Sequence, residues 1–231
     1  MVFIQIMMQV NFNSPNFTSR NPSVRQADRI CHMVNSQFPA ISTSKLSKKI
    51  EHNSKYKKFY SYSFDLSHKI NSKVRDKVAL VKNDIIARYK KIAELVQKER
   101  LANCDEYARL ASLICSANDI KSQQLIVKYL SNENLDVKPC NHVALALIPD
   151  DKLIVDERMS NLKDVIIIDP WLGIADYAPN VALKYKNIFP EYLNLKSGDE
   201  PLMSSANFNY KLKEDHFEEV RTEFPEFVIK K

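Results

Sequence analysis

A cysteine, a histidine and an aspartate in this chain could together attack an amide carbonyl. They are Cys104, His142 and Asp169, in that order along 231 residues. A thiol becomes a nucleophile at neutral pH when a neighbouring base takes its proton, and histidine is the usual base. A carboxylate bonded to the imidazole fixes its tautomer and stabilises the imidazolium. We therefore take the three as candidate nucleophile, general base and orienting acid.

The sequence around Cys104 is typical of a helix N-terminus. Asn103 is a favourable N-cap residue, and Glu106 follows three residues later, the spacing of a capping box. Cys104 is thereby expected in the first turn, where free N–H groups and the positive helix end favour a thiolate. Asp105 and Glu106 oppose this effect by like-charge repulsion, so a protonated histidine is needed nearby. The helix face that continues from the cysteine is small and suits close packing on a sheet: Ala108, Ala111 and Cys115.

The elements that must position these residues follow from hydrophobic periodicity. Three-to-four-residue spacing predicts helices over residues 23–38, 72–100 and 104–117. Runs rich in β-formers predict strands over residues 124–129, 142–148 and 165–169, with further edge strands at 206–212 and 226–230. His142 then opens the second strand and Asp169 closes the third. Helices that precede a sheet indicate an α+β fold.

Composition and charge narrow the class of protein. The chain is 45% hydrophobic and 27% charged, as globular proteins are, and its net charge of +6 favours acidic partners without requiring nucleic acid. With two glycines it has no glycine-rich phosphate loop. The four cysteines form no C-x-x-C pair, which indicates free thiols in a reducing compartment. Residues 1–12 are apolar but show neither a signal peptide nor a transmembrane length, so we expect a strand or a packed arm.

Three motifs resemble the transglutaminase-like branch of the papain-like cysteine enzymes. They are NCDEYARLA from Asn103, NHVALAL from Asn141 and IIIDPWLG from Ile166. The resemblance covers roughly residues 100–175. It implies a papain-like/transglutaminase-like core, with N-terminal helices packed on an antiparallel sheet and with Cys104, His142 and Asp169 at the catalytic positions. We accordingly expect one catalytic domain over residues 1–231, with a core at 72–231 and an N-terminal helical decoration within 1–70.

The chain also departs from the family pattern. Many relatives have a glycine before the catalytic motif, where this chain has Ala102. Papain-like enzymes place a glutamine upstream to help hold the oxyanion; Gln97 is a candidate, but the Cys104 backbone N–H is a more secure donor. The insert at 149–164 is longer than a tight hairpin and is expected to be a lid or specificity loop.

The resemblance further implies a reaction and a setting. The reaction is acyl transfer on protein amides through a Cys104 thioester, as transglutaminase or glutamine deamidase, with cysteine protease as the alternative. The strongest similarity is to translocated bacterial effectors. It implies a soluble protein that is secreted into the host cytoplasm and acts on a glutamine-bearing host protein, with no cofactor and no metal.

Two readings from other classes compete with the enzyme. Cys140 and His142, with Cys104 and Asp169, could supply four zinc ligands, although no zinc-finger spacing supports this. A non-enzymatic interaction module would rely on the basic segment 45–58, which fits phosphates or an anionic membrane surface but equally a solvated helix face. Two assignments also stay open. Trp171 either walls the cleft or packs in the core, and nearby acids compete with Asp169 as the orienting residue: Asp150, Asp151, Asp156 and Asp164.

Overall fold

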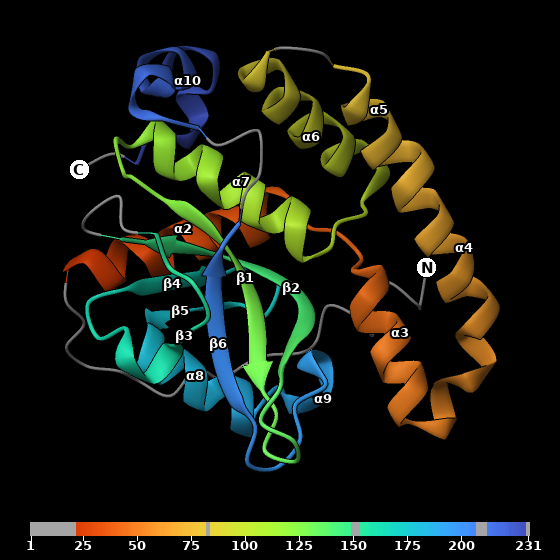
Figure 1. Cartoon of the computed structure of the whole chain (residues 1–231). Helices are drawn as coiled ribbons and strands as arrows, with labels where there is room; N and C mark the ends of the chain where they lie inside the picture. The colour runs from red at the N-terminus through yellow and green to blue at the C-terminus, as the bar shows by residue number, and fades with distance from the viewer. Residues whose placement is uncertain (1–21, 82–83, 149–152, 207–211, 230–231) are drawn as a thin grey trace.

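The computed structural model describes residues 22–81, 84–148, 153–206 and 212–229 (Figure 1). The apolar segment 1–12 lies outside these ranges, as do residues 149–152 of the predicted lid and 207–211 of a predicted edge strand.

One antiparallel sheet forms the centre of the described fold. Its strands lie in the order β3-β6-β1-β2-β4-β5, and every neighbouring pair is antiparallel. Their bounds are Gln123–Leu130 for β1, Val137–Leu147 for β2, Glu157–Arg158 for β3, Ile166–Asp169 for β4, Ile174–Tyr177 for β5 and Glu200–Ser205 for β6. The α+β class is therefore confirmed.

The strands around the predicted site lie where the sequence placed them, with two corrections. β2 begins five residues before His142, so this histidine lies inside the strand and does not open it. The last strand is β6, at 200–205, and residues 225–227 form a 3₁₀ turn where an edge strand was predicted. β6 forms because it pairs with β1. Its second residue is Pro201, which has no N–H to donate to a neighbouring strand, and a proline in a sequence argues against a strand inside a sheet.

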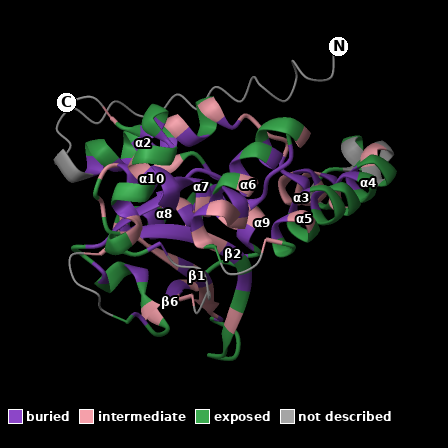
Figure 2. Cartoon of the chain, turned by 90° about the horizontal axis from the view of Figure 1, so that it is seen from above, coloured by how far each residue is buried: buried purple, intermediate pink, exposed green. Residues whose placement is uncertain are grey.

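Helix α7 (Cys104–Ala117) lies across the sheet. It begins at the predicted cysteine and packs against β1, β2 and β4. Its small face makes this approach possible, because Ala108, Ala111 and Cys115 are all fully or almost fully buried. Helix α2 (Pro22–Gln37) lies beside α7 and packs against β4 and β5, so it covers the sheet directly (Figure 2).

A helical arm stands at the side of this body (Figure 1). It consists of α3 (Thr43–His52), a 3₁₀ segment Ser54–Phe59, α4 (Tyr60–Ile70), a π-helical segment Asn71–Arg75 and α5 (Asp76–Ala79). Helix α6 (Ile85–Glu99) follows as a separate helix. The prediction of one helix over 72–100 is therefore wrong. Asp84 starts a new helix by accepting a hydrogen bond from the Ala87 N–H at 2.9 Å.

The remaining helices cover the rest of the sheet and of α7. They are α8 (Ala178–Asn187), α9 (Pro190–Leu193) and α10 (Phe217–Glu223). Helix α8 packs against β4, β5 and β6, and α10 packs on α7. Among the described helices, none is both long and apolar enough to cross a bilayer.

Candidate active site

His142 and Asp169 meet in the core, between β2 and β4. A hydrogen bond of 2.7 Å joins His142 Nε2 to Asp169 Oδ2. Both residues are buried, with 2% and 0% of their surfaces exposed. The antiparallel pairing of the two strands brings the histidine and the strand-closing aspartate to the same end of the sheet. The structure thus brings together the predicted base and acid.

Asp169 is held as a carboxylate by further donors. The Tyr185 hydroxyl donates to Oδ2 at 2.8 Å, and the Leu172 N–H donates to Oδ1 at 3.1 Å. Burial alone raises the pKa of Asp169, but the charge of His142 and these hydrogen bonds outweigh it, so the pKa lies below its ordinary value. Tyr185 is fully buried on α8 and contacts the His142 ring edge-on at 6.0 Å between centroids. The sequence analysis missed this residue.

The second nitrogen of His142, Nδ1, is buried and has no hydrogen-bond partner among the residues that the structure describes, while Nε2 is occupied by Asp169. Burial lowers the pKa of His142, but the Asp169 charge and hydrogen bond, together with a smaller contribution from Cys104, raise it above its ordinary value. Since Nε2 is engaged, Nδ1 is the ring atom left to exchange a proton with the thiol.

Cys104 lies in the first turn of α7 and is the one cysteine of the four that is not buried. Its Sγ lies 3.8 Å from the Asn141 carbonyl oxygen, next to His142. Cys104 is thus partly open to solvent, and its thiol lies against the strand that carries His142.

A β-bulge in β2 creates this approach. Val127 of β1 pairs with His142, but the next residue, Lys128, pairs with Pro139, so Cys140 and Asn141 are extra residues in β2. Asn141 adopts a left-handed backbone with φ of 51°. Non-glycine residues adopt this conformation rarely, Asn more readily than most, and bulges redirect side chains next to functional sites. The bulge turns the Asn141 carbonyl toward the Cys104 thiol, and the regular pairing of β2 with β1 resumes at His142.

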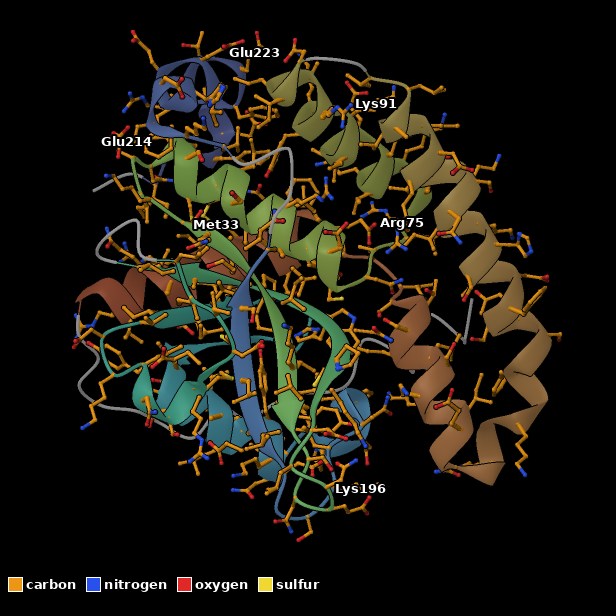
Figure 3. All side chains as sticks on the ribbon, viewed as in Figure 1. Met33, Arg75, Lys91, Lys196, Glu214 and Glu223 are labelled. Atoms are coloured by element: carbon orange, nitrogen blue, oxygen red, sulfur yellow. The ribbon has the colours of Figure 1, made fainter. Side chains whose placement is uncertain are left out.

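The N-terminus of α7 is fixed from two directions. Glu106 accepts a hydrogen bond from the Asn103 N–H at 2.9 Å, as a capping box requires. The Asn103 side-chain oxygen accepts hydrogen bonds from the turn that starts α3: Ser42 Oγ, Thr43 Oγ1, Ser44 N and Ser44 Oγ, at 3.0–3.2 Å. The far part of the arm contributes as well, because Arg75 donates to Glu106 at 2.8 and 3.3 Å. Figure 3 labels Arg75 between the arm and α7. Both ends of the arm therefore hold the turn that carries Cys104.

Trp171 links the same turn to the histidine. Its ring centroid lies 4.9 Å from that of His142, and its indole N–H donates to Ser42 Oγ at 2.6 Å. The Lys45 ammonium lies 5.0 Å from the ring centroid. Trp171 is 4% exposed, so it shields the imidazole while belonging to the core. The two roles considered for this residue are compatible.

The two competing acids that the structure describes lie away from His142, on other contacts or in solvent. Asp156 is bonded to Lys128 and Ser204, and Asp164 is exposed, while residues 150 and 151 lie outside the described ranges. Gln97 is exposed on α6. Across the described ranges, no group of three or more His, Cys, Asp or Glu side chains could hold a metal ion. The four residues that a zinc site would need therefore do not form one.

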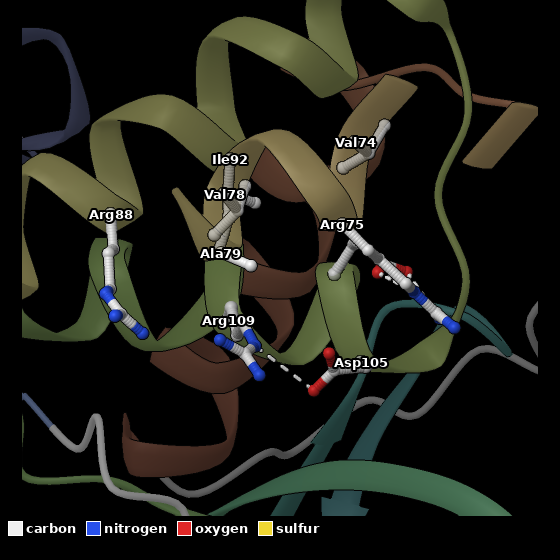
Figure 4. A pocket seen from close by; sticks show the side chains of 9 residues that line it. Val74, Arg75, Val78, Ala79, Arg88, Ile92, Asp105 and Arg109 are labelled. Carbon is white, nitrogen blue, oxygen red and sulfur yellow. Dashed lines mark hydrogen bonds and ion pairs between the residues drawn. The ribbon is translucent and has the colours of Figure 1, made fainter. Parts of the chain in front are cut away.

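A cavity of about 260 Å³ lies behind the first turns of α7 (Figure 4). Its lining combines apolar side chains with charged ones: Val74, Arg75, Val78, Ala79, Arg88, Ile92, Asp105, Glu106 and Arg109. Two of the arginines bind acids within it, Arg75 to Glu106 and Arg109 to Asp105. None of the three candidate catalytic residues lines this cavity.

Comparison with protein-family models, with curated proteins and with solved structures finds no match for this chain.

Proposed function

We propose that the protein is a cysteine-dependent acyltransferase or hydrolase acting on protein amide groups through a Cys104 thioester. One observation carries the proposal. One ring nitrogen of His142 is bonded to the buried carboxylate of Asp169, and the other has no hydrogen-bond partner among the described residues. The preceding residue, Asn141, has its carbonyl oxygen in contact with the Cys104 thiol. An unpaired buried nitrogen is costly in a purely structural histidine. It is the arrangement that a general base needs.

In the resting site the Cys104 thiol has already given its proton to His142 Nδ1, and the resulting imidazolium stands beside the thiolate. The thiolate adds to the amide carbonyl, and the backbone N–H of Cys104, which has no intrahelical acceptor in the first turn, stabilises the oxyanion. The imidazolium then gives its proton to the departing nitrogen, which leaves as ammonia or an amine. A thioester remains on Cys104. Asp169 stabilises the imidazolium throughout, and its carboxylate is in turn held by Tyr185.

The acyl donor and the acyl acceptor together decide between the reaction classes. Water yields glutamate from glutamine, the ε-amine of lysine yields an isopeptide bond, and attack on a backbone amide yields proteolysis. The resemblance to transglutaminase-like enzymes favours glutamine chemistry on a host protein, with proteolysis as the second candidate.

Intact-mass analysis of candidate glutamine-bearing proteins tests the proposal. Deamidation adds about 1 Da per site, crosslinking gives a covalent adduct, and cleavage gives fragments. Every product should disappear in Cys104→Ala and persist in Cys115→Ala, a matched change to a fully buried cysteine in the same helix. A product that survives Cys104→Ala contradicts the proposal.

A further inference from the structure

The arm that holds the Cys104 turn carries the whole net positive charge of the protein. Residues 43–79 contain ten Lys and Arg against three Asp and Glu, a net charge of +7, whereas the complete chain has +6. The rest of the chain is therefore slightly acidic, at −1. Such segregation is a feature of interaction surfaces, because charge needed only for solubility is spread over the whole molecule.

Aromatic residues are interleaved with the lysines in the middle of the arm. Residues 55–64 contain three lysines and five aromatic residues, and no acid occurs between residues 52 and 64. The fold leaves two of the aromatics outside the core, since Phe64 is 60% and Tyr62 is 44% exposed. Lys55 and Lys57 are exposed in the same segment. Aromatic rings beside lysines are typical of residues that sit at the level of lipid headgroups.

The shape of the arm places this segment outward. Helices α3 and α4 pack on one another and are joined by the 3₁₀ segment, so residues 54–59 form the turn of a helical hairpin. In Figures 1 and 2, α4 lies at the edge of the molecule, away from the sheet. Leu66 and Ile70 form the buried side of α4. Lys48 attaches the hairpin to the body, because it donates to Asn194 Oδ1 at 2.6 Å. Lys55 and Lys57, by contrast, are exposed, as are Tyr62 and Phe64.

We propose that the tip of this arm, residues 53–64, is a peripheral docking site for an anionic lipid surface. Lysine ammonium groups are attracted to the negative surface, and the aromatic rings enter the headgroup layer. Two features favour lipid over nucleic acid. The tip is the turn of a helical hairpin at the edge of the molecule, whereas single-stranded nucleic acids are bound in grooves. Its cations are lysines, not arginines, which bind phosphates with two parallel hydrogen bonds. This inference does not depend on the proposed enzymatic activity.

Flotation of the full chain with lipid vesicles tests the docking site. Binding is expected to vesicles of phosphatidylcholine with about one third phosphatidylserine, and not to phosphatidylcholine alone, and it should weaken steeply with salt. Each lysine near the surface contributes roughly a fivefold factor to partitioning, so Lys55→Glu with Lys57→Glu should weaken binding at least about 25-fold. Phe64→Ser should weaken binding at unchanged charge, because it removes the ring that enters the headgroup layer.

The matched control is Lys163→Glu with Lys213→Glu, which changes the net charge equally at two exposed body positions. It should retain most of the binding. Equal losses in both double variants would show non-specific attraction and overturn the proposal. Failure to bind the anionic vesicles would overturn it as well, and binding of a single-stranded RNA in the same experiment would then assign the tip to nucleic acid.

Discussion

At Asp169, a fully buried carboxylate accepts hydrogen bonds from an imidazole, a phenol and a backbone N–H. The sequence could identify this residue only as an acid at the end of an apolar strand, with four competitors nearby. What distinguishes Asp169 from these competing acids includes its hydrogen bond from Tyr185, 16 residues further along the chain. No sequence signal marks Tyr185 as that partner. Polar networks assembled in the core are beyond local patterns, since they depend on how helices and strands pack.

The His142–Asp169 pair should make stability depend on pH. The raised pKa of His142 adds to the free energy of unfolding. This stabilisation is complete below about pH 6.5 and is lost as the pH rises through the pKa of His142 in the folded protein. The lowered pKa of Asp169 gives a second stabilisation, which is complete above about pH 4 and is lost as the pH falls through the pKa of Asp169 in the folded protein. Both contributions are present between these two limits.

Asp169→Asn should therefore lower the free energy of unfolding most in this window, by about 3–5 kcal/mol, because it breaks a buried ion pair. Urea denaturation at a series of pH values measures the difference, which should shrink toward alkaline pH. Asp164→Asn, at an exposed position, should change stability by no more than about 0.5 kcal/mol. A loss that is independent of pH would show that His142 and Asp169 do not form an ion pair.

Helix α7 is the element that the sequence predicted most completely. Asn103 and Glu106 marked its start, and the small residues marked the face that meets the sheet. β2 was predicted less well, because a bulge depends on pairing with β1 and leaves no periodic pattern. The prediction therefore had His142 at the strand entrance, whereas the bulge at Cys140 and Asn141 brings a mid-strand histidine to the thiol.

The two ends of α7 allow reactivity to be separated from stability. Asn103→Ala removes the acceptor for the turn at residues 42–44 and should destabilise the protein by about 2 kcal/mol while slowing Cys104 alkylation. Asn118 at the other end bonds Ile114, Phe227 and Ile229 through its side chain. Asn118→Ala should cost similar stability and leave alkylation unchanged. Equal slowing in both variants would mean that the Asn103 contacts do not position the thiol.

At the scale of the whole molecule, the arm contacts the Cys104 turn and also carries the proposed lipid-docking tip. The continuous apolar spacing through residues 78, 81, 85 and 89 predicted one long helix, and it hid the break before Asp84. Only the folded chain shows that the arm starts at Ser42 and returns at Arg75, and that both places contact residues flanking Cys104. These contacts span 61 and 31 residues, separations that local sequence patterns do not encode.

The pH dependence of Cys104 alkylation is the most direct test of whether His142 activates the Cys104 thiol. The other three cysteines are poor references, because burial, the largest cause in each, raises their pKa values and hides them from reagents. The reference is His142→Ala in the same chain, with glutathione as a free thiol.

Iodoacetamide labelling, followed by peptide mass analysis, gives the rate at Cys104 between pH 5.5 and 9. We predict that Cys104 of the unaltered protein reacts readily at about pH 6, where a free thiol is less than about 1% ionised. In His142→Ala the rate at that pH should fall by about 100-fold and follow that of glutathione. A rate and pH profile that His142→Ala leaves unchanged would contradict the claim that His142 activates Cys104.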